Sequence, residues 1–84
     1  MHSSRFDRAV ILTHHARSRM QERGVTDAEL LAIIENGTVR AKDERRIWIY
    51  REFAGRQDNL LCVAALLEDA LIVKTIMTHW EVSP

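Results

Sequence analysis

Residues 13–37 contain two short stretches with helical spacing of apolar residues, each followed by a glycine. Thr13 is suited to begin the first helix, because its hydroxyl can accept a hydrogen bond from a backbone N–H of the first turn. We therefore predict a helix over His14 to Arg23. Gly24 is expected to end it in the left-handed conformation, which glycine adopts without steric cost.

A second helix is predicted for Asp27 to Asn36. Thr26 and Glu29 form a capping box, in which each side chain bonds the backbone N–H of the other residue. The apolar run within this helix should be buried, and Gly37 should end it. Because so few residues separate the two helices, they should form an αα-hairpin.

After the second helix, apolar and polar residues alternate, which is the period of a β-strand. In the predicted strand Arg46 to Phe53, Ile47 and Ile49 fall on one side, and Trp48 and Tyr50 fall on the other. The helices are expected to cover the side of Ile47, so the two aromatic residues should lie on the uncovered face.

Two more strands should follow a polar turn at residues 54–59. Leu60 to Leu67 is apolar on both faces, as in a central strand. A tight turn leads into a last strand, Leu71 to His79. Strict alternation places Met77 on the helix-facing side of this strand and Ile76 on the opposite side.

A short first strand, Phe6 to Leu12, completes the predicted elements. Three consecutive strands joined by short turns form an antiparallel meander. The sequence thus predicts an α+β fold of two layers in the order β-α-α-β-β-β, with the helix hairpin on one face of a mainly antiparallel sheet. Its length suits one domain, residues 1–84, with residues 1–5 and 81–84 loose.

Composition narrows the class of protein. No apolar run approaches the roughly 18 residues that cross a bilayer, so no membrane partner is expected. Cys62 is the single cysteine, which excludes a disulfide framework and favours the cytoplasm. No cofactor or metal is expected, because His14 and His15 point about 100° apart on a helix and no cysteine pair is present.

Charge is balanced overall but unevenly distributed. The formal net charge is zero, yet residues 1–23 carry five arginines against two acidic residues. Residues 38–56 carry six basic and three acidic residues. Folding could gather these blocks into one basic face that binds a polyanion such as RNA. The alternative is an ordinary surface of mixed charge.

The first helix offers one candidate site. His15, Arg19 and Glu22 fall on the same side of the predicted helix, at spacings where side chains meet. Arg19 could hold a phosphate through a forked contact, and His15 could transfer a proton near neutral pH. The alternative is a solvated network of ion pairs without chemical activity.

The sheet offers a second candidate site. Arg46, Trp48, Tyr50 and Lys74 should share the uncovered face. Nucleobases stack on aromatic rings of this kind, and cations pair with phosphates. A homodimer interface, or a C-terminal segment folded over the sheet, would explain the same residues. His79, on the helix-facing side, is expected to approach the first helix.

The run H-A-R-S-R-M-Q-E-R-G-V, beginning at His15, resembles the opening of an uncharacterised bacterial domain family with the motif H-A-x-x-R-M-x-E-R-G. That family implies no established activity. The order of a strand, two helices and a meander is also distantly similar to RelE-type toxins. This likeness implies metal-independent RNA cleavage from the sheet by residues such as Arg46, Tyr50 and Lys74, and an antitoxin protein as partner.

We therefore consider two main hypotheses. The first is a RelE-like ribonuclease, in which Tyr50 or His15 acts as general base and cations stabilise the phosphate. The second is a non-catalytic module that binds nucleic acid or protein through the uncovered sheet face. The residues assigned to catalysis are His15, Arg19, Arg46 and Tyr50, and those assigned to nucleic-acid binding are Arg23, Trp48 and Lys74.

Overall fold

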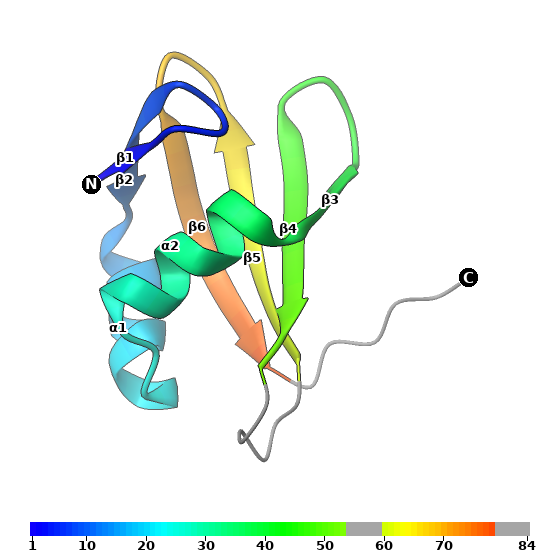
Figure 1. Cartoon of the computed structure of the whole chain (residues 1–84). Coiled ribbons are helices and arrows are strands. Elements are labelled where there is room, and N and C mark those ends of the chain that lie inside the picture. The colour runs from blue at the N-terminus through cyan, green and yellow to red at the C-terminus, as the bar shows by residue number, and fades with distance from the viewer. Residues whose placement is uncertain (54–59, 79–84) are drawn as a thin grey trace.

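The computed structural model describes residues 1–53 and 60–78 of the 84-residue chain, and within them the chain forms two helices and six strands (Figure 1). The elements in chain order are β1 (His2–Ser3), β2 (Arg8–Leu12), α1 (His14–Arg23), α2 (Asp27–Asn36), β3 (Thr38–Ala41), β4 (Arg46–Glu52), β5 (Leu60–Leu67) and β6 (Leu71–Thr78). The α+β class is confirmed. The predicted order is incomplete, because β1 and β3 were not foreseen.

The strands form one mixed sheet in the order β1-β2-β6-β5-β4-β3. All neighbouring strands are antiparallel except β2 and β6, which run parallel. The meander of β4, β5 and β6 was predicted correctly, and the apolar β5 lies in the interior of the sheet as expected. The parallel pairing of β2 was not predicted, so the sheet is mixed.

Both helices lie on the same face of the sheet, where α1 packs on β6 and β2, and α2 packs on β4 and β5 (Figure 1). Their predicted boundaries are confirmed. The Ala16 N–H donates to Thr13 Oγ1 over 3.1 Å, and Gly24 adopts a left-handed conformation with φ 63°. The predicted capping box between Thr26 and Glu29 is present at the start of α2.

The core fills the space between the helices and this face of the sheet. Leu30, Ile33 and Ile34 of α2 are fully buried. They are joined by buried apolar residues of the strands, which are Val10, Ile47, Ile49, Leu61, Val63, Ala65, Leu71, Val73 and Ile76. The burial of these residues supplies most of the driving force for folding.

A β-bulge in β6 corrects the predicted alternation of that strand. Ala64 pairs with Thr75, whereas the next residue, Ala65, pairs with Val73, so Lys74 is an extra residue without a cross-strand partner. Such a bulge shifts the following side chains to the other face. Ile76 is therefore fully buried in the core, where alternation had placed Met77.

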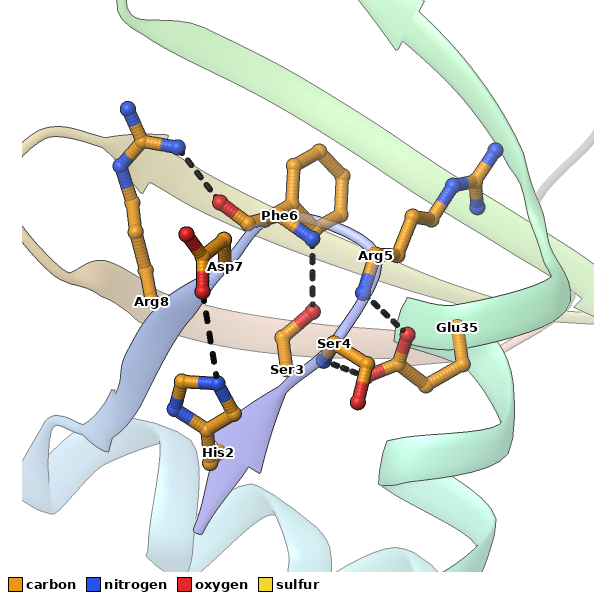
Figure 2. A network of polar contacts seen from close by, with 8 residues as sticks. All are labelled: His2, Ser3, Ser4, Arg5, Phe6, Asp7, Arg8 and Glu35. Carbon is orange, nitrogen blue, oxygen red and sulfur yellow. Dashed lines mark hydrogen bonds and ion pairs between the residues drawn. The ribbon is translucent and has the colours of Figure 1, made fainter.

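The N-terminal residues, which we expected to be loose, form β1 and a turn that contacts the end of α2 (Figure 2). The backbone N–H groups of Ser4 and Arg5 donate to the two oxygens of the Glu35 carboxylate, over 2.7 and 2.8 Å. The Arg5 side chain donates to the carbonyls of Ile34 and Gly37, which lie at the C-terminal end of α2. A cation is favourable there, because the helix dipole is negative at that end.

These contacts change the acidity of Glu35. Burial raises the pKa of its carboxyl, but the N–H groups of Arg5 and Ser4, the Ser3 hydroxyl and the Arg5 charge together lower it below the usual value. Glu35 therefore stabilises the turn in its ionised form.

Candidate nucleic-acid interface

The sheet face turned away from the helices, here called the open face, carries Trp48 and Tyr50. Ile47 and Ile49 alternate with these residues in β4 and are buried under the helices. Trp48 and Tyr50 must therefore point to the opposite side, where both are half-buried. The predicted division of this strand into two faces is confirmed.

The strand register brings cationic residues to the same part of the open face. Trp48 pairs with Arg40 on one side and with Ala64 on the other. Ala64 in turn pairs with Thr75, directly after the bulged Lys74. Since paired residues share a face, this row combines the Trp48 ring with the Arg40 side chain, and Lys74 adjoins the row next to Thr75.

A hollow of about 230 Å³ lies beside Trp48 on the open face. The described residues that line it include three cations and no carboxylate: they are Lys42, Arg46, Ile47, Trp48, Ala64, Ala65, Leu66 and Lys74. Three of the predicted site residues, Arg46, Trp48 and Lys74, are thus brought together.

Lys42 was not among the predicted site residues. It follows β3 in the turn before β4, and its Nζ lies 5.8 Å from the centroid of the Trp48 ring. A cation at this distance is attracted by the negative face of the ring. The signal in the sequence was the basic block of residues 38–56, but the pairing of Lys42 with Trp48 depends on how the β3–β4 turn folds.

The conformation of Arg46 is set by Asp43. One carboxylate oxygen accepts the backbone N–H groups of Arg45 and Arg46, and the other accepts Arg46 Nε over 2.6 Å. The N–H groups of Arg46 and Arg45, followed by the Arg46 side chain, lower the pKa of Asp43 to about 2. A second hollow, of about 320 Å³, adjoins this ion pair and is lined by Asp43, Arg45, Arg46 and Leu66.

Tyr50 lies one row further along the open face, paired with Thr38 and Cys62. Cys62 is fully buried, and burial raises the pKa of its thiol to about 12. Only the thiolate is a strong nucleophile. Cys62 therefore stays protonated near neutral pH and contributes no nucleophile to the open face.

An apolar row extends from the edge of the hollow across the open face toward β2. Leu66 pairs with Ile72, and Ile72 pairs with Ile11. Ile11 is 51% exposed, although it is a large apolar residue. The protein-binding and homodimer hypotheses were based on the residues around Trp48, and this exposed apolar row adds to their support, because such patches are typical of protein contacts.

The side chains of α1 form the predicted group on one helix face. Arg19 Nε donates to His15 Nε2 over 3.4 Å, and Arg19 Nη1 forms a 2.8 Å ion pair with Glu22. The guanidinium is therefore engaged from two sides by residues of its own helix. This geometry fits the solvated ion-pair network better than a phosphate-binding site.

The two candidate sites lie on opposite faces of the sheet. α1 packs on the covered face, so His15 and Arg19 do not share a site with Arg46 and Tyr50. Arg23, also predicted to bind nucleic acid, is half-buried and donates to the Thr78 hydroxyl over 2.6 Å. This contact joins the end of α1 to β6.

Some expectations fall on residues 54–59 and 79–84, which lie outside the described part of the chain; these include the position of His79 and the loose residues 81–84.

In the part of the chain that is described, no three His, Cys, Asp or Glu side chains are grouped closely enough to hold a metal ion. Neither described helix has the length and apolar character to span a membrane.

Comparison with known proteins gives a family but no activity. Searches of curated proteins and of solved structures returned no match. A family model described as a domain of unknown function matches residues 12–78, which include both helices and all strands from β3 onward. Because this match covers most of the chain, the protein belongs to the family Domain of unknown function (DUF4258).

Proposed function

We propose that this protein binds single-stranded RNA through the open face of its sheet. The observation that carries the proposal is the hollow beside Trp48, which is lined by Lys42, Arg46 and Lys74. Unpaired bases stack on aromatic side chains, and cations at the edge of such a surface neutralise phosphates. RNA as partner agrees with the expected cytoplasmic location.

The zero net charge of the chain is compatible with this function, because polyanions respond to local charge. Three cations line the hollow, and the neighbouring Asp43 is paired with Arg46. Each phosphate neutralised on a single strand contributes about −0.7 to the slope of log K against log salt. Three such contacts predict a slope of about −2.

The test is a titration of the protein with a short labelled RNA at several salt concentrations. Lys74→Gln should weaken binding and make the salt slope shallower by about 0.7, since one phosphate contact is lost. Trp48→Leu should weaken binding at every salt concentration, since stacking does not depend on salt. Arg17→Gln is the matched control, because Arg17 is exposed on α1, behind the sheet. Equal effects of Lys74→Gln and Arg17→Gln would contradict the proposal.

A second candidate function is metal-independent RNA cleavage of the RelE type. It is supported by the order of strand, helix hairpin and antiparallel strands, and by the location of Arg46, Tyr50 and Lys74 on one sheet face. Tyr50 would act as general base on a ribose hydroxyl, while Arg46 and Lys74 stabilise the phosphate. His15 and Arg19 do not belong to this proposed catalytic site, because α1 lies on the other face of the sheet.

Incubation of RNA with the protein in EDTA tests for cleavage. Products that persist in EDTA and disappear with Tyr50→Phe would support the ribonuclease. RNA that is bound but stays intact would refute cleavage and leave the binding function. A ribonuclease toxin would also slow growth of a host that expresses it, and co-expression of an antitoxin would relieve this effect.

A further inference from the structure

The bulge in β6 leaves Lys74 opposite no residue of β5. As the extra residue of the bulge, Lys74 has no cross-strand partner, and its side chain lines the hollow beside Trp48. Bulges redirect side chains and are over-represented next to functional sites. The Thr13 hydroxyl donates to the Lys74 carbonyl over 3.2 Å, which ties this position to the start of α1.

Small residues create the space in front of Lys74. Ala64 pairs directly with Trp48 and lines the hollow together with Ala65. A leucine at position 64 would extend into the space that the alanine methyl group leaves open. The result is a recess with an indole wall, an aliphatic floor and three cations.

The volume of the recess limits its occupant. At about 230 Å³ it is smaller than the roughly 300–1,000 Å³ of pockets that enclose drug-sized ligands. We propose that it is a subsite for one nucleotide, whose base stacks on Trp48 and whose phosphate is bound by Lys74 and Arg46. This inference rests on the proposed RNA-binding function, in which the occupant is one nucleotide of the strand. A free nucleotide offers the same base and phosphate, so the experiment below distinguishes the two sources.

The experiment uses the fluorescence of Trp48 in a Trp80→Phe background, in which Trp48 is the remaining tryptophan. The full-length protein is titrated separately with 5′-AMP, adenosine and inorganic phosphate. We expect 5′-AMP to bind at least about tenfold more tightly than adenosine or phosphate, because it alone makes both the stacking and the charged contacts. Equal affinities for 5′-AMP and adenosine would overturn the proposal.

Two variants separate the base from the phosphate. Lys74→Gln should remove most of the preference for 5′-AMP over adenosine. Ala64→Leu should abolish binding of both ligands by filling the recess, whereas Ala28→Leu, at an exposed position of α2, should leave binding unchanged. Thermal unfolding of each variant is the control for correct folding. Unchanged 5′-AMP binding in a folded Ala64→Leu, or in Lys74→Gln, would overturn the subsite.

Competition with a short RNA distinguishes the source of the nucleotide. Displacement of 5′-AMP by the RNA is expected if the recess holds one nucleotide of a strand. RNA binding that survives in Ala64→Leu, together with no 5′-AMP binding to the parent protein, would refute the subsite and leave the RNA interface intact. Binding of 5′-AMP without any RNA binding would support the subsite for a free nucleotide and refute the RNA-binding function.

Discussion

Replacement of Thr13 by valine tests how α1 is attached to the sheet. The Thr13 hydroxyl accepts from the Ala16 N–H over 3.1 Å, and it donates to the Lys74 carbonyl over 3.2 Å. Valine has nearly the same shape but can form neither hydrogen bond. The substitution therefore removes the N-cap of α1 and the hydroxyl contact to the bulge in one step.

The expected loss follows from these two contacts. An N-cap hydroxyl contributes about 1 kcal/mol to the free energy of unfolding. The hydrogen bond to Lys74 should contribute about 1 kcal/mol more. In a domain of this size, a loss of about 2 kcal/mol lowers the melting temperature by roughly 8–16 °C.

Thermal and urea unfolding, followed by circular dichroism, measure this loss. Thr26→Val is the matched control, because Thr26 caps α2 through the Glu29 N–H over 3.1 Å. The Thr26 hydroxyl also donates to the Glu29 carboxylate over 3.1 Å, but both of its bonds stay within the first turn of α2, so Thr26→Val should lose about 1 kcal/mol for the whole N-cap. Thr13→Ser retains a hydroxyl and should stay close to the parent protein. The two assigned roles of the Thr13 hydroxyl are refuted if Thr13→Val is no more destabilising than Thr26→Val, or if Thr13→Ser is as unstable as Thr13→Val.

Two further predictions concern the glycines and Glu35. Gly37→Ala should cost about 3 kcal/mol, because a Cβ would lie 2.5 Å from the Ile33 carbonyl oxygen and force the backbone to move. Gly24→Ala should cost only about 1 kcal/mol, since the left-handed φ at this position is strained for alanine but the space around it is open. Equal losses of stability for the two variants in urea unfolding would contradict the predicted order. Glu35→Gln should be less stable than the parent at pH 7. Because folding lowers the Glu35 pKa, that difference should disappear as the pH falls below about 4.3 and through the folded-state pKa. A difference independent of pH would show that the Glu35 charge is not involved.

Local patterns in the sequence were sufficient to predict both helices and the two faces of β4. Thr13, Gly24 and the capping box act within one helical turn, so their effect can be read from neighbouring residues. Alternation in β4 likewise predicted that Trp48 and Ile47 lie on opposite faces, because the side-chain period of a strand is local. The alternation in β4 and β6 was sufficient to predict that Trp48, Arg46 and Lys74 share the open face.

Contacts between segments that are distant in the chain became known only from the folded arrangement of the strands. β3 is an edge strand of four residues that are all exposed, so it is too short for its alternation of polar and apolar residues to predict a strand. The turn after β1 is held by the Glu35 carboxylate, a contact between residues far apart in the chain (Figure 2). The bulge at Lys74 is a property of the pairing of β6 with β5, and the Lys74 carbonyl accepts a hydrogen bond from the Thr13 hydroxyl, which is distant in the chain.

The candidate site shows the same division. The sequence identified both groups of residues, but the structure placed His15 and Arg19 behind the sheet and added Lys42 beside Trp48. Periodicity says which side of its own element a residue occupies. It does not say which side chains from distant elements will meet, such as Lys42 and Trp48, because those contacts depend on how the turns and strands of the whole domain are arranged.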